Sequence, residues 1–232
     1  MERNLLLVLI SDLLFGVSMG IFFTYIMLYL YALNFSYFLM SLFISVGFLS
    51  SFMGSIIGGF YADKFGRKKG LCIGRFLFSL LFVVIVLKIY SLLFVAYILE
   101  GFGISMGGIA REALLGEAIK EEERGFYYNL LNSSIGLGWG LGAFVSSRIV
   151  AAKGTIHGFE FSSNIGLLLG LVSSIIILYL VETKMPTERK NDNELRELFD
   201  KRFIMLLTIT VIFFTALLFT WSYLAIYAKE VL

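Results

Sequence analysis

Three residue types that often build stabilising or reactive sites are almost missing from this sequence. The 232 residues include one cysteine (Cys72), one histidine (His157) and one proline (Pro186). A single cysteine excludes an intrachain disulfide, and one cysteine with one histidine excludes a cysteine/histidine metal cluster. We therefore expect no metal site and no cofactor.

Charge is also scarce. Charged residues make up 16% of the sequence and hydrophobic residues 59%, which is far from the composition of a soluble domain. The formal net charge of +2 is too small to indicate a nucleic-acid partner. The composition predicts a membrane protein whose main partner is the lipid bilayer.

Long charge-poor stretches predict where the chain crosses the membrane, because a spanning helix needs about 20 mostly apolar residues. Seven stretches carry at most one charge each: 5–31, 37–61, 70–87, 90–110, 126–147, 161–181 and 203–228. Continuous apolar runs such as Ile175–Leu180 lack the alternation of barrel strands. We expect an all-α membrane protein with seven transmembrane helices.

The distribution of lysine and arginine predicts the orientation. With the N-terminus inside, 15 of the 19 basic residues lie in the inner segments, and inner segments are where such residues accumulate. The prediction is a multi-pass protein of the cell membrane with a cytoplasmic N-terminus and an outer C-terminus.

One strongly charged segment divides the chain. Residues 182–202 hold 12 charged side chains in 21 positions, and we interpret them as a cytoplasmic linker after a six-helix bundle at 1–181. Within the linker, either a short amphipathic helix at the inner interface or a disordered tether fits the composition. Residues 203–232 then form one further helix.

The predicted loop after the second span carries a specific motif. An aspartate, a glycine and four cations follow a glycine at fixed spacing, namely Gly59, Asp63, Lys64, Gly66, Arg67, Lys68 and Lys69. The spacing and the position of the loop match the pattern G-x-x-x-D-[RK]-x-G-R-[RK]-[RK]. In this respect the chain resembles the major facilitator superfamily of transporters.

The resemblance implies a fold and a mechanism. Each six-helix half of this family consists of two inverted three-helix repeats, and solutes pass by alternating access between the halves. The chain would be the first half with its linker and one extra helix, and a secondary active transporter of a small solute. Asp63 would act as a gating latch, and Glu117 would be the partner of Arg67. Glu100 stands near the place where the family commonly has an arginine in helix 4.

Four glycines in the fifth span are spaced for close helix contact. The i,i+4 pairs are Gly136 with Gly140 and Gly138 with Gly142, and small residues at this spacing let two membrane helices approach closely. We interpret them as packing positions rather than as an antiporter motif.

Two carboxylates lie well inside predicted spans, Asp12 and Glu100. Such residues usually face the interior of the bundle, often on an ion or proton path, so both are candidates for proton or substrate coupling. Asp12 could instead extend toward the inner interface or cap a backbone. Either carboxylate could also pair with Arg75 or Arg111.

The family's full members have twelve helices, so helices 8 to 12 are missing. The chain could be a truncated, non-transporting remnant, a subunit of a split transporter whose second chain supplies these helices, or a half that forms a homodimer. An enzyme is disfavoured, because no catalytic serine/histidine or paired-carboxylate motif occurs in the spans. We expect His157 to be a surface residue of an outer loop.

Overall fold

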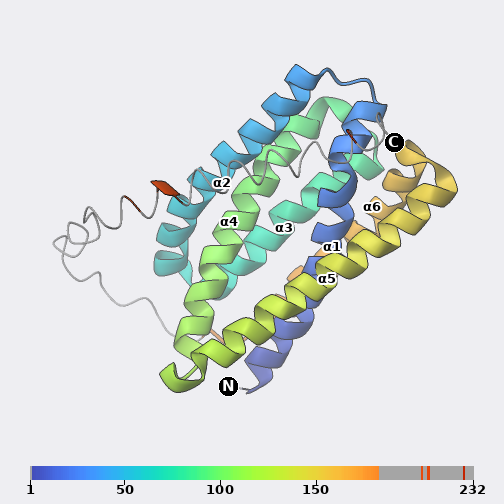
Figure 1. Ribbon diagram of the computed structural model, residues 1–232. Coiled ribbons are helices and arrows are strands. Elements are labelled where there is room, and N and C mark those ends of the chain that lie inside the picture. The colour runs from blue at the N-terminus through green and yellow to red at the C-terminus, as the bar shows by residue number, and fades with distance from the viewer. Residues whose placement is uncertain (1, 183–204, 206–207, 210–226, 228–232) are drawn as a thin grey trace. The chain divides into compact units, whose positions relative to one another are not determined.

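Six long helices joined by short turns make up the described part of the chain (Figure 1). The computed structural model describes residues 2–182, 205, 208–209 and 227. The helices are α1 (Glu2–Ala32), α2 (Tyr37–Phe65), α3 (Arg67–Val86), α4 (Leu93–Ala118), α5 (Arg124–Lys153) and α6 (Thr155–Leu178), and the single turns η1 (Tyr90–Leu92) and η2 (Glu121–Glu123) precede α4 and α5. All six are long and apolar enough to cross a membrane. The prediction of a helical, multi-pass membrane protein is confirmed.

The count of seven helices is supported only for six. The seventh predicted span, 203–228, and the linker, 182–202, lie almost entirely outside the described residues. The chain divides into the units Met1–Pro186 and Thr187–Leu232. All six helices belong to the first unit, and only this unit is described below.

The helices extend beyond the charge-free stretches. Arg111, predicted at the foot of a span ending at residue 110, lies inside α4. Only Gly154, with a φ of +79° that suits glycine, separates α5 from α6. His157 therefore lies in the first turn of α6, and its prediction as a loop residue was wrong. A charge-free stretch indicates which residues fit the hydrocarbon core, whereas helical hydrogen bonding continues beyond it.

The six helices pack closely in some pairs and not in others. Helix α1 packs against α5 and α6, and α4 packs against α2 and α3. In Figure 1, α1 (blue) and α5 (yellow) run side by side. Neither α1 nor α5 belongs to the closely packed neighbours of α4. A space lined by side chains therefore remains between these helices.

Close contact between α1 and α5 depends on glycines from both helices. A Cβ atom at Gly138 or Gly142 would collide with the backbone of α1 at Val17, and one at Gly16 would collide with the backbone of α5. By contrast, a Cβ at Gly136 or at Gly140 would meet no atom within 4 Å. Only one of the two glycine pairs therefore packs against α1.

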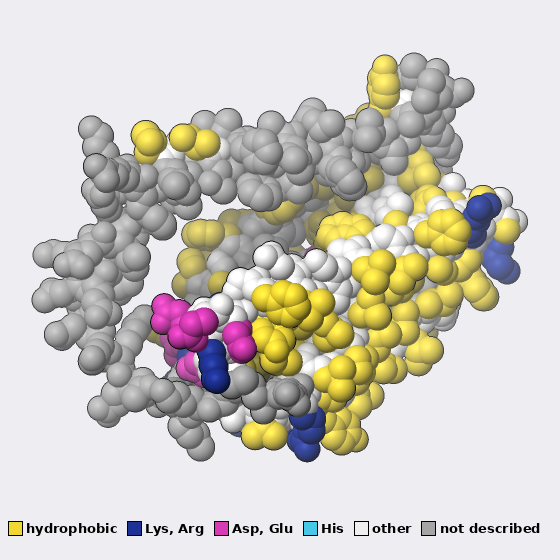
Figure 2. Space-filling view, turned by 60° about the horizontal axis from the view of Figure 1, so that its bottom comes forward, with side chains coloured by type: hydrophobic (Ala, Val, Ile, Leu, Met, Phe, Trp, Pro, Cys, Tyr) yellow, Lys and Arg dark blue, Asp and Glu magenta, His cyan; other side chains and the backbone are white. Residues whose placement is uncertain are grey.

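The outer surface of the bundle is apolar. Hydrophobic side chains cover most of the described surface visible in Figure 2, and charged side chains are confined to small patches. Large side chains such as Phe38, Leu49 and Phe144 are more than half exposed. This surface suits contact with lipid chains, because the backbone polar groups of each helix are already hydrogen-bonded within the helix.

Candidate functional site

The sequence motif forms the turn between α2 and α3. Gly66 connects the two helices with a φ of 101°, and its N–H donates to the carbonyl of Ala62. This φ is strained for any residue with a Cβ. Asp63, Lys64 and Lys69 are exposed around the turn. We call this end of the bundle, with the connection from α4 to α5, the motif end.

Two interactions fix the motif to neighbouring helices. Arg67 of α3 forms an ion pair with Glu117 of α4, and its Nη1 donates to the Ala113 carbonyl at 3.3 Å. The Glu182 carboxylate, just after α6, accepts the backbone N–H groups of Arg67 at 3.1 Å and Lys68 at 3.3 Å. A carboxylate here complements the positive N-terminal end of α3. Sequence reasoning missed Glu182, because it belongs to a segment that reads as solvated.

A buried ion cluster lies further inside the bundle. Asp12 is completely buried, and it pairs with Arg75 of α3 and Arg111 of α4. Its Oδ1 accepts from Arg75 Nη2, and its Oδ2 accepts from Arg111 Nε at 2.8 Å. We call Asp12, Arg75 and Arg111 the arginine cluster. The sequence left several roles open for Asp12. In the structure it forms ion pairs with both arginines.

Serine hydroxyls complete the surroundings of Arg75. Its Nη1 donates to Ser11 Oγ of α1 and, at 2.6 Å, to Ser173 Oγ of α6. The two serines also bond each other at 3.0 Å. Because a buried guanidinium is costly unless its protons find acceptors, these contacts stabilise the charge and tie three helices together.

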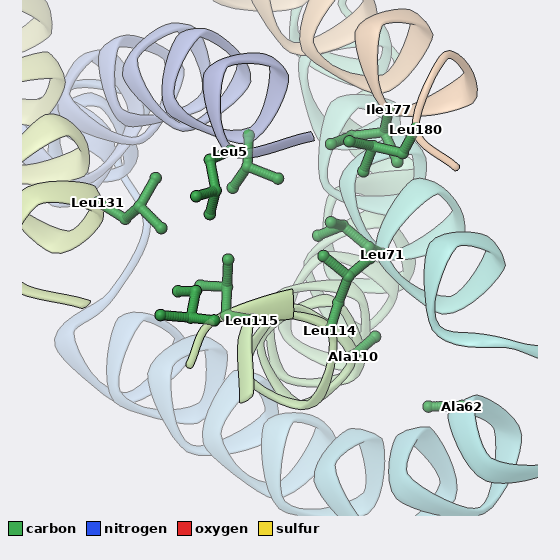
Figure 3. Close-up of a cluster of buried hydrophobic side chains, with 11 residues drawn as sticks. Leu5, Ala62, Leu71, Ala110, Leu114, Leu115, Leu131, Ile177 and Leu180 are labelled. Carbon is green, nitrogen blue, oxygen red and sulfur yellow. The ribbon is translucent and has the colours of Figure 1, made fainter. Parts of the chain in front are cut away.

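An apolar layer separates the arginine cluster from the motif end. It consists of buried side chains from all six helices and the residues after α6, including Leu5, Leu71, Leu114, Leu131 and Ile177. Figure 3 shows them converging from several ribbons. Leu71 precedes Arg75 by one helical turn, and Leu114 follows Arg111 by about one turn. Along α3 and α4, this apolar layer therefore lies between the motif residues and the arginine cluster.

A cavity opens beside the arginine cluster. It has a volume of about 270 Å³ and lies between α1, α3, α4 and α5, in the gap that the helix packing leaves. Its wall includes Phe15, Arg75, Glu112, Asn132 and Ile135, together with Arg111. Arg111 Nη1 donates to Glu112 Oε1 at 2.5 Å and to Asn132 Oδ1 at 3.2 Å.

Glu100 is isolated from these charges. Its side chain on α4 is 2% exposed, and Oε1 has no hydrogen-bond partner among the described residues. It shares a helical face with Gly103 and Gly107, and both glycines contact α3 at Gly74. Within the described residues no cation pairs with Glu100. Its surroundings therefore differ in kind from those of Asp12.

A second polar cluster holds the opposite end together. Glu160 of α6 accepts from Tyr90 at 2.9 Å and Tyr29 at 3.4 Å, and pairs with Lys88 at 2.8 Å. This interaction raises the pKa of Lys88. His157 Nδ1 lies 3.5 Å from the same carboxylate. Sequence reasoning missed the cluster, since its members come from three separate segments.

Curated relatives are transporters. Over 133 residues, 57% of this chain, it is 26% identical to the human "Solute carrier family 2, facilitated glucose transporter member 12", covering 21% of that protein. Over 147 residues, 62% of this chain, it is 29% identical to the "Niacin transporter NiaP" of Acinetobacter baylyi, covering 31% of that protein. The matched regions thus span less than a third of these relatives.

Solved structures share the fold. A peptide transporter in complex with alafosfalin aligns with a TM-score of 0.65 and 21% identity over 94% of this chain and 46% of the other. A D-xylose-proton symporter aligns with a TM-score of 0.64 and 16% identity over 96% of this chain and 55% of the other. The family model described as "Major Facilitator Superfamily" matches residues 5–232. This chain therefore belongs to the major facilitator superfamily, a family of transporters and not of enzymes.

Proposed function

We propose that the chain is the first half of a proton-coupled secondary transporter that moves a small solute by alternating access. The observation that supports proton coupling is the isolation of Glu100 from other charges. An ionised carboxylate is costly inside a membrane unless a cation or donors compensate it. Asp12 has two arginines, whereas Glu100 has neither a cation nor a partner for Oε1 among the described residues. Glu100 therefore carries a proton while the bundle is closed around it.

The helix contacts support two inverted repeats, α1–α3 and α4–α6. Inversion pairs α1 with α4, α2 with α5 and α3 with α6. The contacts of α1 with α5 and α6 then correspond to those of α4 with α2 and α3, and all four pairs are closely packed. In this arrangement 1–181 is the transporting bundle, 182–202 the cytoplasmic linker, and 203–232 the start of a second half.

The gate lies at the motif end, which the charge distribution assigns to the cytoplasm, with the C-terminus outside. Asp63 is exposed and available to a helix N-terminus of the second half. Arg67 and Glu117 hold α3 and α4 in register beside it. A complete solute path also needs a second half with helices 8 to 12, which a separate chain or another copy of this chain could supply.

Uptake into vesicles tests this function. The chain is reconstituted together with a second half that supplies helices 8 to 12, and labelled glucose, xylose, niacin and a dipeptide are offered under an inward proton gradient. We expect accumulation of one solute that increases with the gradient. Glu100→Gln should abolish accumulation but retain downhill exchange, because the solute path persists without its proton carrier. Full accumulation in this variant would exclude Glu100 as the carrier.

A second candidate is a non-transporting subunit or remnant. The chain aligns with about half the length of the solved transporters, and a complete solute path in this family lies between two halves. Absence of uptake for every solute, in vesicles where the chain is folded and a second half is present, would favour this candidate.

A further inference from the structure

Two hydrogen-bond donors of the arginines beside the cavity have no acceptor among the described residues. Arg75 is 2% exposed, and its Nε has no acceptor among the described residues. Arg111 Nη2 lies 2.8 Å from Asp12 Oδ2 as part of the ion pair but lacks the alignment of a hydrogen bond. Both arginines line the cavity. Buried donors without acceptors are rare in folded proteins and call for an explanation.

Among the described residues, a carboxylate at the edge of the cavity balances the charge of the buried cluster. Asp12 faces two arginines, which leaves one positive charge over in the buried cluster. The carboxylate that offsets this charge belongs to Glu112, which pairs with Arg111 at 2.5 Å. The Glu112 side chain is 49% exposed, so it can leave Arg111 for water at little cost. A second carboxylate could then take its position.

The residues on the other walls of the cavity indicate the size and polarity of a suitable ligand. Asn132 uses its Oδ1 to accept from Arg111, which leaves its amide NH₂ as a donor. Phe15, Ile104 and Ile135 supply apolar surface, and Arg75 stacks 5.0 Å from the Phe15 ring. A volume of about 270 Å³ lies just below the usual range for small-molecule sites. The cavity thus suits a compact solute with one anionic end and an apolar body.

We propose that this cavity binds the carboxylate of a small organic acid, with Arg75 and Arg111 as its donors and Glu112 as the carboxylate that it displaces. The proposal rests on the proposed function and adds to it the class of solute. Guanidinium groups suit this role because they hold carboxylates through charge-assisted, directional hydrogen bonds. Asp12 keeps the two arginines in place but cannot satisfy all their donors.

Binding to the purified 232-residue chain in detergent tests the proposal without any need for transport. The probes are two pairs of equal shape, benzoate with benzamide and butyrate with butyramide, measured by calorimetry. We expect at least one carboxylate to bind about tenfold more tightly than its amide, which is the usual gain from one hydrogen bond to a charged group. Equal affinity within both pairs, or no binding of either carboxylate, would overturn the proposal.

Two variants of matched type locate the site. Gly108 lines the cavity and has open space where a Cβ would be, so Gly108→Leu fills the cavity without a backbone collision. Gly140 has the same open space on α5 but does not line the cavity, so Gly140→Leu is the control. Carboxylate binding should disappear in the first variant and persist in the second. Binding that survives in Gly108→Leu would contradict the assignment.

A third variant changes Glu112, the carboxylate that the ligand would displace, and leaves both arginines in place. Glu112→Gln should tighten carboxylate binding by about threefold, because the competing charge on Arg111 is gone; weaker binding would count against displacement. Glu100→Gln should leave carboxylate binding unchanged. If proton coupling fails but this pattern of binding holds, only the proposed coupling is wrong. If neutral solutes are accumulated and no carboxylate binds, only the present proposal is wrong.

Discussion

Arg111 of α4 bonds Asp12 of α1 across a part of the bundle in which these two helices are not closely packed. The contact between Nε and Oδ2 is 2.8 Å long, and Arg75 bonds the other carboxylate oxygen from α3. One buried carboxylate therefore connects three helices at the wall of a cavity. At this point an ion pair, rather than close packing of the helices, connects α1 with α4.

Replacing Asp12 should strongly destabilise the chain. Asp12→Asn leaves two buried guanidinium groups without a shared anion, and loss of one partner from a buried ion pair costs about 3–5 kcal/mol. Ser173→Ala removes one hydrogen bond to Arg75 and should cost about 1.5 kcal/mol. Unfolding in detergent followed by circular dichroism measures both. Equal stabilities of Asp12→Asn and the wild type would show that the cluster contributes nothing net.

The exposed motif residues should behave differently. Asp63→Asn should leave the unfolding of the chain unchanged, because Asp63 is exposed and no ion pair involves it among the described residues. Arg67→Ala should cost about 0.2–1 kcal/mol, the usual range for a partly exposed ion pair. In the completed transporter, both changes should abolish uptake. Marked unfolding of Asp63→Asn would make its role structural rather than gating.

The two faces of α5 offer a matched pair of glycine variants. Gly138→Leu should destabilise the chain by at least about 1–3 kcal/mol, because its side chain would collide with the backbone of α1. Gly136→Leu should be tolerated, since its Cβ would meet open space. Thermal unfolding of both variants in the same detergent checks the prediction. Equal losses would mean that α1 and α5 pack through other residues.

The sequence predicts the spans well because hydrophobicity is a property of each stretch by itself. It does not predict helix ends, and so Arg111 and His157 were placed outside the helices that contain them. It also left the partners of Asp12 open. Depth in the membrane follows from position along a helix, but the direction in which a side chain points depends on how each helix is rotated against its neighbours. Only the packed bundle gives that rotation.

Contacts between distant segments were harder still to predict. Nothing near Glu182 in the sequence indicates that its carboxylate bonds the start of α3, more than a hundred residues earlier. The Arg67 and Glu117 pair was expected from the family resemblance, and the structure contains that ion pair. Whether this pair contributes to gating is a separate prediction, which the uptake experiments address.

Glu182 provides a test of the contact between α6 and the motif. Glu182→Gln removes the negative charge at the N-terminus of α3, where such a charge contributes about 0.3–1 kcal/mol. We expect a loss of that size and faster amide hydrogen exchange at Arg67 and Lys68, whose N–H groups it accepts. Asp63→Asn is the control, because it changes one nearby charge without removing an acceptor. Unchanged exchange at both amides would contradict the contact.

The ion pair of Lys88 with Glu160 should stabilise the opposite end of the bundle in a pH-dependent manner. The pKa of Lys88 is raised, first because Glu160 accepts its hydrogen bond and also through the attraction of the two charges. A raised lysine pKa means that the stabilisation is complete below the unfolded value, about 10.4, and is lost as the pH rises through the folded value.

The suitable variant is Lys88→Asn, because Lys88 has a φ of +58° and asparagine tolerates that conformation. The wild type should unfold at a higher temperature than the variant at pH 8 and pH 9, by the same margin at both. That margin should shrink between about pH 10 and pH 12, while other titrating groups affect both proteins alike. A margin that stays constant up to pH 12 would show that the charge of Lys88 contributes nothing to this end of the bundle.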